Sequence, residues 1–459
     1  MREKEKMAKY KDFDDDYRYE DEEDYEYLNR RRDSNRTSTV RSTSKTSSKK
    51  RTHSRRPRKK MKRWVMILVC IIEVIVVFGL LGTYYLVDKF GEITYDPNIK
   101  DFIVDNKEEM DKETVDTLKG YTNILLLGSD TRDNSLEALN KKYNNHTDAI
   151  IVCSINNDTK EIRLVSIYRD TVLKISDPED PSHSELRKAT ESMFFYGTAS
   201  TLNMVNVNLD LDISEYVMVN WSALIDIVDA VDGVDLEITE EERIWLNAYL
   251  VDTSVNTGRK YKEVQKSGYV HLDGIQATAY CRIRATTGWD YRRTERQRAV
   301  LTEIFKKAKS MNVAQLNAAI EAVVGNVATS LSANEIIELA SHITKYNLIE
   351  TGGFPTVRAE GMGIMEKGKF VDIVAPDDLQ SNVSELHRFL FGTENYTPTA
   401  TVQNISKEIA SALVGPPTEK PTQKPTEKPT QKPTQKPTEK PTEKQTEKPT
   451  EKQTEKPAE

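Results

Sequence analysis

Residues 122–130 read TNILLLGSD, and this stretch decides the fold class because its apolar run ends abruptly in the turn residues GSD. Such a run indicates a buried strand closed by a turn. Two more strands are predicted at residues 147–155 (TDAIIVCSI) and 161–167 (EIRLVSI), and the intervening NND at residues 156–158 is a hairpin signal. The sequence therefore predicts three buried strands, two of which are joined by a tight turn.

Helical patterns follow these strands along the chain. Residues 192–204 and 221–230 show helical periodicity, and residues 292–308 predict an amphipathic helix with a basic start. Residues 231–238 are interpreted as a turn followed by a strand, and residues 271–274 (HLDG) as the cap of a helix or a turn that leads into residues 277–283. Because helices and strands alternate, the sequence indicates the α/β class.

The two ends of the 459-residue chain differ in composition from its centre. The formal net charge is -7, but acidic residues crowd positions 12–26, whereas lysine and arginine dominate positions 30–63. Charged blocks with few apolar residues do not build a core, so residues 1–63 are predicted to be disordered. Tetrapeptides of the type PTEK and PTQK repeat from Pro417, and residues 396–459 are predicted to form a disordered polar tail. This tail would either contact an extracellular polymer or serve as an inert spacer.

Residues 64–87 form an apolar run in which Glu73 is the only charge. At about 1.5 Å per residue, a helix of this length spans the hydrocarbon core of a bilayer. The basic flank at residues 55–63 (RRPRKKMKR) predicts a cytoplasmic N-terminus and an extracellular remainder. We therefore expect a single-pass protein of the cell membrane, with residues 88–120 as an extracellular stalk.

Three cysteines occur, at positions 70, 153 and 281, and none has the spacing of a metal site or a disulfide framework. Free buried thiols are the expected state. A bridge between Cys153 and Cys281 would require their strands to be adjacent, which spacing alone does not decide.

Aspartates and an arginine lie beside the predicted strands. Asp130 ends the first strand and Asp148 begins the second, and two carboxylates brought together favour a hard divalent cation such as magnesium between them. The alternative is that both are ordinary strand-end or capping residues. Arg169 follows the third strand, where ligands bind in α/β sheets, although it could equally form a surface ion pair with Asp170.

A second group of arginines lies further along the chain. Arg282 and Arg284 alternate in the predicted strand CRIRA, and Arg293, Arg296 and Gln297 lie about one helical turn apart in the helix that follows. Converging guanidinium groups suit phosphate oxygens. The alternative is a structural ion-pair network with Asp290 and Glu295. Nucleic acid is not expected as the anion, because the predicted topology places this region outside the cell.

The order of these motifs resembles that of the LytR-CpsA-Psr family of Gram-positive envelope enzymes. The matching segments are GSD (128–130), TD (147–148), SIYRD (166–170), HLDGIQATAYCRIR (271–284) and DYRRTERQ (290–297). The resemblance covers about residues 121–300 and is expected to continue to about residue 395. It implies a catalytic domain at residues 121–395 with a central mixed β-sheet flanked by helices.

The resemblance also implies an activity. Members of the family are thought to take a glycopolymer, such as teichoic acid or capsule polysaccharide, from undecaprenyl pyrophosphate and attach it to peptidoglycan as a phosphodiester. Two other readings stay open. In one, water is the acceptor and the enzyme is a pyrophosphatase acting on the same lipid. In the other, the protein is a non-catalytic polyprenyl-phosphate binder that regulates the envelope.

Residue roles follow from the same resemblance. Asp130 and Asp148 would hold Mg²⁺, or alternatively Mn²⁺, and Arg169 would position the reacting phosphoryl group together with Asp148. The residues expected to grip the remaining pyrophosphate oxygens are Arg282, Arg284, Arg293, Arg296 and Gln297, with His146 beside them. His146 stands where the family usually has arginine, and Tyr168 where it usually has proline. Because histidine is not always charged near neutral pH, phosphate binding there is expected to be weaker or pH-dependent. Helices at residues 192–204 and 221–231 could line an apolar tunnel for the isoprenoid.

Overall fold

The computed structural model describes residues 94–130, 145–286, 289–323 and 326–416. The predicted charged region at residues 1–63, the predicted membrane segment at residues 64–87 and the repeats from residue 417 lie outside the described residues. Within these described ranges, no helix combines the length and the apolar character needed to cross a bilayer.

A mixed sheet forms the centre of the fold, with its strands in the order β1-β10-β7-β2-β3-β4-β11. The pairs β2-β3, β3-β4 and β7-β10 are antiparallel, whereas β2-β7, β4-β11 and β1-β10 are parallel. The strands are β1 (Thr94–Tyr95), β2 (Tyr121–Ser129), β3 (Thr147–Asn156), β4 (Glu161–Ile167), β7 (Glu215–Val219), β10 (Val327–Thr329) and β11 (Asn347–Phe354). The three strands predicted from the sequence are therefore β2, β3 and β4, and the predicted hairpin joins β3 to β4.

Both faces of this sheet are buried, which explains why its strands are almost continuously apolar. Leu125 and Val152 belong to the hydrophobic cluster on one face, whereas Ile124 and Ile151 belong to the cluster on the other. Successive side chains of a strand point to opposite faces, so one apolar run supplies both cores.

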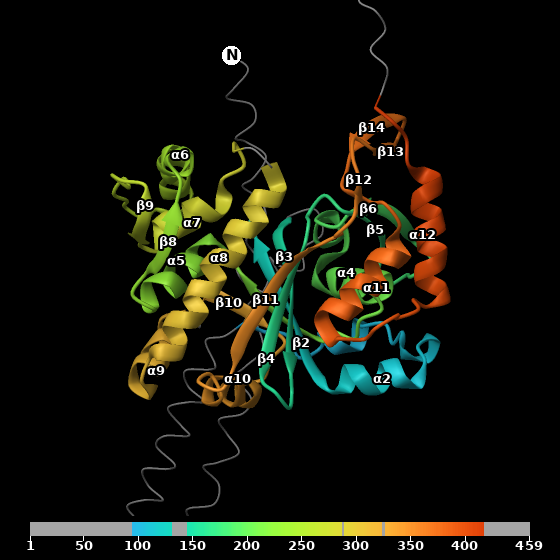
Figure 1. Ribbon diagram of the computed structural model, residues 1–459, viewed down its shortest axis with the longest axis horizontal. Coiled ribbons are helices and arrows are strands. Elements are labelled where there is room, and N and C mark those ends of the chain that lie inside the picture. Colours follow the sequence, from blue (N-terminus) through green and yellow to red (C-terminus); the bar gives the residue numbers. More distant parts are fainter. Residues whose placement is uncertain (1–93, 131–144, 287–288, 324–325, 417–459) are drawn as a thin grey trace, which may run out of the picture. The chain divides into compact units, whose positions relative to one another are not determined.

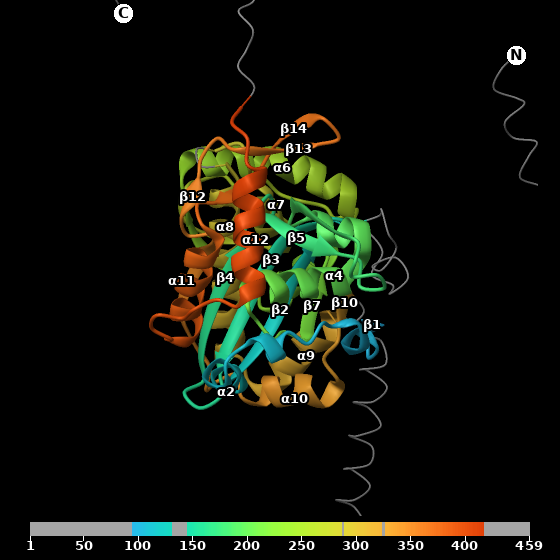
Figure 2. The same ribbon diagram turned by 90° about the vertical axis from the view of Figure 1, so that its right-hand side faces the viewer.

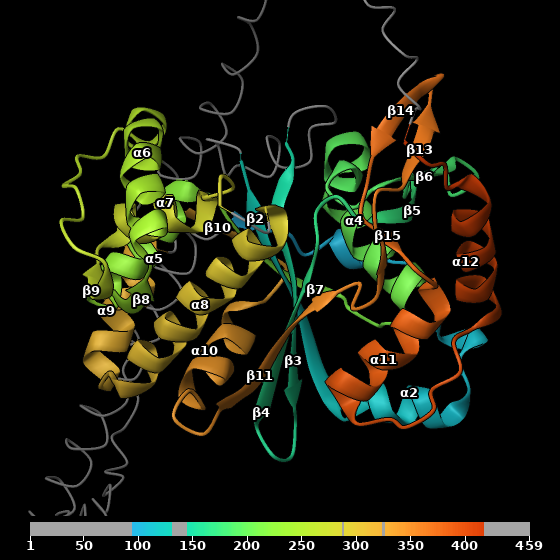
Figure 3. The same ribbon diagram turned by 45° about the horizontal axis from the view of Figure 1, so that its top comes forward.

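Helices cover each face of the sheet (Figures 1 and 3). The first face packs against α2 (Lys112–Lys119), α4 (Glu191–Leu209), α11 (Leu379–Phe391) and α12 (Ala400–Ala412), and Figure 2 looks onto α4, α11 and α12. The second face packs against α8 (Trp289–Ser310) and α10 (Ala333–Ser341), with α9 (Val313–Val323) between them in the chain. The expected mixed sheet flanked by helices is confirmed.

A separate hydrophobic cluster forms beside the sheet from consecutive segments of the chain. Its elements are α5 (Trp221–Ala230), β8 (Val234–Ile238), α6 (Glu240–Thr257), β9 (Gly268–Leu272) and α7 (Gly274–Arg282). Helix α8 joins the two regions, because Val300 packs in this cluster whereas its neighbour Leu301 packs against the sheet. The smaller elements elsewhere are η1 (Ile99–Phe102), η2 (Lys107–Glu109), β5 (Val172–Ser176), β6 (Ser184–Lys188), β12 (Arg358–Ala359), β13 (Gly363–Glu366), β14 (Lys369–Asp372) and β15 (Ala375–Pro376).

The folded unit extends beyond the predicted catalytic domain at both ends. Much of the predicted stalk is folded, because β1 pairs with β10 and Met110 and Leu118 are buried in the core. At the other end, Val402 and Ile405 of α12 are buried in the same core, so the tail does not begin at residue 396. Both segments are mostly polar in sequence, and a few apolar residues at helical spacing are enough to dock them.

The strand predicted at CRIRA (residues 281–285) is wrong, because Cys281 and Arg282 end helix α7 and the residues after them form no strand. The cap at residues 271–274 starts a helix, which was one of its two interpretations. Asp273 caps the helix by accepting a hydrogen bond from the backbone nitrogen of Gln276, and the Gln276 side chain accepts one from the backbone nitrogen of Asp273, each at 3.0 Å. This capping box starts a helix that is enclosed on most sides, so its apolar residues show no helical stripe. Cys281 lies on this helix and Cys153 on β3; both thiols are free, and burial raises the pKa of each to about 12.

Candidate active site

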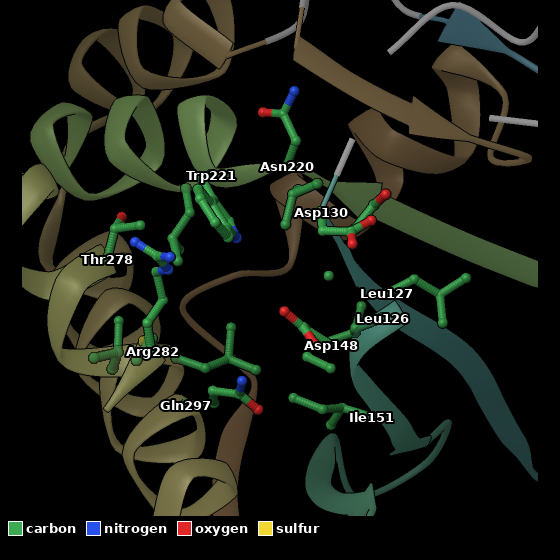
Figure 4. Close-up of a pocket in the computed structure, with 18 of the residues that line it drawn as sticks. Leu126, Leu127, Asp130, Asp148, Ile151, Asn220, Trp221, Thr278, Arg282 and Gln297 are labelled. Atoms are coloured by element: carbon green, nitrogen blue, oxygen red, sulfur yellow. The ribbon is translucent and has the colours of Figure 1, made fainter. Parts of the chain in front are cut away.

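A cavity of about 590 Å³ lies between the sheet and the helices α5, α7 and α8 (Figure 4). Its polar lining includes Asp130, His146, Asp148, Arg169, Arg282, Arg284, Arg293 and Gln297. Its apolar lining includes Leu126, Ile151, Val217, Leu224, Ile227, Val300, Leu301 and Ile304. Six of the seven residues predicted to bind pyrophosphate, and both predicted metal ligands, therefore share one cavity.

The cavity has a charged end and an apolar end because of how its strands and α8 run. Asp130 and Asp148 lie at the same end of β2 and β3, and the apolar pair Leu126 and Ile151 lies further along these strands in register. On α8, Arg293 and Gln297 come first, and the lining residues one and two turns later are apolar. The arrangement suits a molecule with an anionic head and an apolar tail.

Asp148 gathers three arginines at the charged end, and we call these four residues the Asp148 cluster. The guanidinium of Arg169 donates to Oδ1 of Asp148, and Nη2 of Arg284 donates to the same oxygen at 3.2 Å. Arg293 donates from Nη2 to the backbone oxygen of Asp148 at 3.2 Å, and its Nη1 lies 3.7 Å from Oδ1. Arginines that follow β4, follow α7 and lie on α8 thus converge on the start of strand β3.

The charges at this end favour an anionic ligand. Four arginines and two aspartates line the cavity, so these residues leave a formal excess of two positive charges. Arg284 is 45% exposed and remains accessible from solvent, whereas Arg293 is only 2% exposed. Arginine forks held in a partly buried site bind phosphate oxygens more strongly than the same groups do in water.

Asp130 and His146 form the other side of the charged end. The backbone nitrogen of His146 donates to Oδ1 of Asp130 at 2.9 Å, and Nδ1 of His146 lies 3.9 Å from Oδ2. The His146 ring stacks on Phe194, with the ring centroids 4.5 Å apart. These contacts hold His146 at the cavity. It is the residue that stands where the resembling family usually has arginine.

The two aspartates fit a divalent cation that takes its other ligands from a substrate. Asp130 and Asp148 both line the cavity, and Figure 4 shows both carboxylates at the charged end. Among the residues that the structure describes, no group of three or more acidic, histidine or cysteine side chains could hold a metal ion. Mg²⁺ is commonly bound through one or two carboxylates, with phosphate oxygens and water completing the octahedron. The donor set therefore suits an ion that arrives with a phosphorylated ligand.

Arg282 lines the cavity, but not from a strand as predicted. It is the last residue of α7, and its guanidinium lies 3.7 Å from the centroid of the Trp221 ring. It also donates to Oγ1 of Thr253 at 2.6 Å and to Oδ2 of Asp252 at 2.5 Å. Helix α6 therefore holds this arginine against the wall of the cavity.

Arg296 is not among the residues that line the cavity, and its guanidinium is engaged by other groups of the protein. Its Nε donates to Glu242 at 2.9 Å, and its other nitrogens donate to the backbone oxygen of Ile283 and to Thr286. Burial raises the pKa of Glu242, but hydrogen bonding from Thr239 and the ion pair with Arg296 outweigh burial and hold that pKa below its usual value. Arg296 therefore forms a structural ion pair, but not with the residues named in the alternative. Its partner is Glu242, whereas Glu295 pairs with Arg292 and the Asp290 side chain lies outside the described part.

Only one of the two helices expected to line a lipid tunnel contributes to the apolar lining of the cavity. Helix α5 contributes Leu224 and Ile227, whereas α4 contributes nothing to the lining and packs in the core behind the sheet. Three lining residues were not expected from the sequence: Asn220, Tyr249 and Thr278. Only Asn220 carried a recognisable signal, since an asparagine before an apolar helical run is a typical N-cap.

Comparison with known proteins agrees with this geometry. The LytR_cpsA_psr family matches residues 95–388 of the chain. The teichoic acid transferase TagT of Bacillus subtilis, named as a polyisoprenyl-teichoic acid–peptidoglycan transferase, is 26% identical over 303 residues, covering 66% of this chain and 88% of TagT. TagU of Enterococcus faecalis, a transferase of the same name, is 28% identical over 265 residues, covering 57% of this chain and 78% of TagU.

A solved structure shows the same fold. Protein gbs0355 from Streptococcus agalactiae superimposes with a TM-score of 0.50 at 23% identity, covering 62% of this chain and 92% of that one. The family match spans well over half of the sequence, including the strands, the Asp148 cluster and α8. The chain belongs to the LytR_cpsA_psr family.

Proposed function

We propose that this protein is an extracytoplasmic phosphotransferase that moves a glycopolymer from undecaprenyl pyrophosphate onto peptidoglycan and leaves it attached as a phosphodiester. The observation that carries the proposal is the single cavity with arginines and carboxylates at one end and apolar side chains at the other. The names of TagT and TagU support the same class of donor and acceptor.

In this proposal the two chemically different parts of the donor bind at the two ends of the cavity. Its pyrophosphate lies at the Asp148 cluster, where the guanidinium groups of Arg169, Arg284 and Arg293 converge. Its isoprenoid chain follows the apolar lining contributed by β2, β3, α5 and α8. Burying apolar surface contributes about 25 cal/mol per Å², so the tail supplies much of the binding energy.

The proposed reaction exchanges one phosphorus–oxygen bond for another. A hydroxyl oxygen of peptidoglycan bonds to the phosphorus next to the sugar, the bond from that phosphorus to the bridging oxygen breaks, and the lipid leaves as a monophosphate. The hydroxyl proton passes to water. Phosphoryl transfer needs mainly alignment and stabilisation of charge on the phosphoryl oxygens. Arg169, held by Asp148 and 3.8 Å from Asp170, is the group we assign to that role.

Asp130 and Asp148 would hold Mg²⁺ or Mn²⁺ in this scheme. When bound, the ion would neutralise part of the charge on the pyrophosphate. Asp148 also accepts from two guanidinium groups through Oδ1. Asp148 would thus link the arginines to the cation and fix their relative positions.

The location is part of the same proposal. The apolar run at residues 64–87 is proposed to span the cell membrane, with the charged region at residues 1–63 in the cytoplasm and the cavity outside the cell. In this arrangement the enzyme meets both of its partners, because the lipid-linked glycopolymer is in the membrane and peptidoglycan lies outside it.

The test is a transfer assay with the full chain in phospholipid nanodiscs. The reaction contains a short saccharide on undecaprenyl pyrophosphate, Mg²⁺ and peptidoglycan, and compares the native chain with Arg169→Ala. Arg388→Ala is the matched control, since Arg388 lies on α11 and pairs with Glu385 away from the cavity. We expect the Arg169 variant to lose about 10²- to 10³-fold in rate, as when one stabilising donor is removed from an active site. Transfer retained in this variant, or absent from the native chain, would overturn the proposal.

The same assay separates the two other readings by their products. A pyrophosphatase would release a soluble glycopolymer phosphate whether or not peptidoglycan is added. A regulator without catalytic activity would bind the lipid and leave it unchanged. Either result would contradict the transferase.

A further inference from the structure

Helix α6 carries an exposed apolar face that the proposed function does not use. Ile244 is 54% exposed, Val251 is 53% exposed and Val255 is 78% exposed, and Ala248 is exposed between them. Their spacing of three, four and seven residues places all four on one side of the helix. We call these four residues the outer face of α6.

This face points away from the core on which the helix rests. At about 100° per residue, the outer face lies roughly opposite Leu246, Leu250 and Thr253, which are fully buried. A surface helix normally presents polar residues on the side away from its core. An apolar outer face instead indicates a surface that meets something less polar than water.

Basic residues border the outer face. The loop at residues 258–267 runs back along α6, where the backbone nitrogen of Val264 donates to Asn247 at 2.9 Å and Arg243 donates to the backbone oxygen of Val264 at 3.2 Å. The exposed charged residues of this loop are Arg259, Lys260, Lys262, Glu263 and Lys266. Arg259 pairs with Asp226 at 2.6 Å, so the three lysines and one glutamate leave the loop basic. Trp245, on the same helix, is 36% exposed and adds to its exposed apolar surface.

This combination fits an anionic bilayer better than a protein partner. Lysines are depleted in protein–protein interfaces, whereas they attract the headgroups of anionic lipids. Tryptophan and tyrosine are enriched where proteins meet the lipid headgroups, and helices that lie on a bilayer insert an apolar face bordered by lysine and arginine. The chemistry therefore selects a lipid surface as the occupant.

The same helix also reaches the proposed active site. Tyr249, on the side of α6 between its core and outer faces, lines the cavity. Asp252 and Thr253 hold the guanidinium of Arg282 there. A bilayer in contact with the outer face would therefore lie next to the cavity that we propose for a lipid-linked donor.

We propose that the outer face of α6 and its lysine-bearing loop dock on the anionic surface of the membrane and hold the catalytic unit against it. The proposal goes beyond the transfer reaction and takes from it only the extracytoplasmic location.

The test places a spin label on the outer face of the full chain. A Val255→Cys variant in a Cys70→Ser background is labelled and reconstituted in nanodiscs that contain phosphatidylglycerol, without donor or peptidoglycan. Cys281 is buried and Cys153 is half-buried, and the pKa of each thiol is raised to about 12, so neither is expected to react at neutral pH. The control label replaces Met365, an apolar residue that is 54% exposed on β13. Collision with oxygen and with a water-soluble nickel chelate then reports whether each label lies in lipid or in water.

We expect the Val255 label to be protected from nickel and accessible to oxygen, and the Met365 label to show the reverse. Replacing Lys260 and Lys262 with glutamine should lower the docked fraction by about fivefold per lysine, and neutral lipids should lower it similarly. Equal nickel accessibility at the two labels would overturn the proposal. So would magnetic broadening between Val255 labels, which would indicate a second copy of the chain on this face. Because no turnover is measured, this result is independent of the transfer assay.

Discussion

Two arginines on one helix show how differently the same residue type is used in this molecule. Arg293 and Arg296 are three residues apart on α8 and are 2% and 4% exposed. Arg293 belongs to the Asp148 cluster at the cavity, whereas Arg296 is paired with Glu242 behind the cavity wall. The two arginines lie in the same sequence motif and are almost equally buried, so neither property explains why only one of them lines the cavity.

The two arginines differ in how many guanidinium groups share their carboxylate partner. Asp148 is shared by three guanidinium groups, so the region around Arg293 keeps an excess of positive charge for a ligand. Glu242 is matched to Arg296, and that pair is neutral. We therefore expect changes in the first region to affect transfer and changes in the second to affect stability.

The largest expected effect is on stability, from Arg296→Met. Removing one partner of a buried ion pair leaves an uncompensated charge and costs about 3–5 kcal/mol of the free energy of unfolding. Adding Glu242→Gln should recover part of this loss, because glutamine keeps the capping box of α6 without its charge. Denaturant unfolding of the single and double variants measures both changes. Unchanged stability in the single variant would remove the contrast between the two arginines.

The next largest effect is on the reaction, from Arg293→Met. We expect kcat/KM for transfer to fall by about 10²- to 10³-fold, as for the loss of one charged donor at a reacting phosphoryl group. The matched control is Arg292→Met, because Arg292 is 62% exposed and pairs with Glu295. Transfer kinetics should separate these neighbours, and a similar rate in both variants would argue against the assigned site.

A smaller effect appears as pH dependence of stability. The pKa of Glu242 is lower in the folded protein than its usual 4.5, so its contribution is complete above that value and is lost as pH falls through the folded pKa. Acid should therefore destabilise the native chain more steeply than the double variant Arg296→Met/Glu242→Gln. Thermal unfolding between pH 3 and pH 6 tests this, and parallel pH profiles would contradict it.

The smallest expected effect is at His146, on the Asp130 side of the cavity. His146→Arg supplies a charge that persists at all relevant pH values, and we expect it to tighten donor binding by about two- to fivefold, the size of a partly exposed ion pair. Donor affinity of the native chain and the variant checks the prediction, and an unchanged or weaker affinity in the variant would show that this side chain does not face the phosphate.

The strands were predictable from the sequence because local patterns define them. The apolar runs at residues 122–127, 147–155 and 161–167 are almost continuous, and each lies within the observed strand. The strand expected at CRIRA (281–285) is wrong because burial on most sides of α7 removes the helical stripe on which such predictions rely. The Asp273 cap is the one local signal for a helix here, and from the sequence alone it fits a helix or a turn equally well.

The candidate site was predictable as a set of charges but not as a set of contacts. Asp148 and Arg169 were singled out because charge beside an apolar strand is unusual, and both line the cavity. Nothing local distinguishes Arg293 from Arg296, because the partner of Arg296 is 54 residues away on α6. Tyr249 was missed for the same reason, since it reaches the cavity only when α6 packs against α7.

The most direct test of the central claim follows one phosphorus atom. The full chain in nanodiscs receives a donor that carries ³²P only in the phosphate next to the saccharide, together with Mg²⁺ and peptidoglycan. If the Asp148 cluster directs transfer, the label should appear in peptidoglycan as a phosphodiester, unlabelled lipid monophosphate should form in equal amount, and Arg293→Met should suppress both. Label that stays with the lipid, or that is released as a soluble saccharide phosphate, would contradict the account.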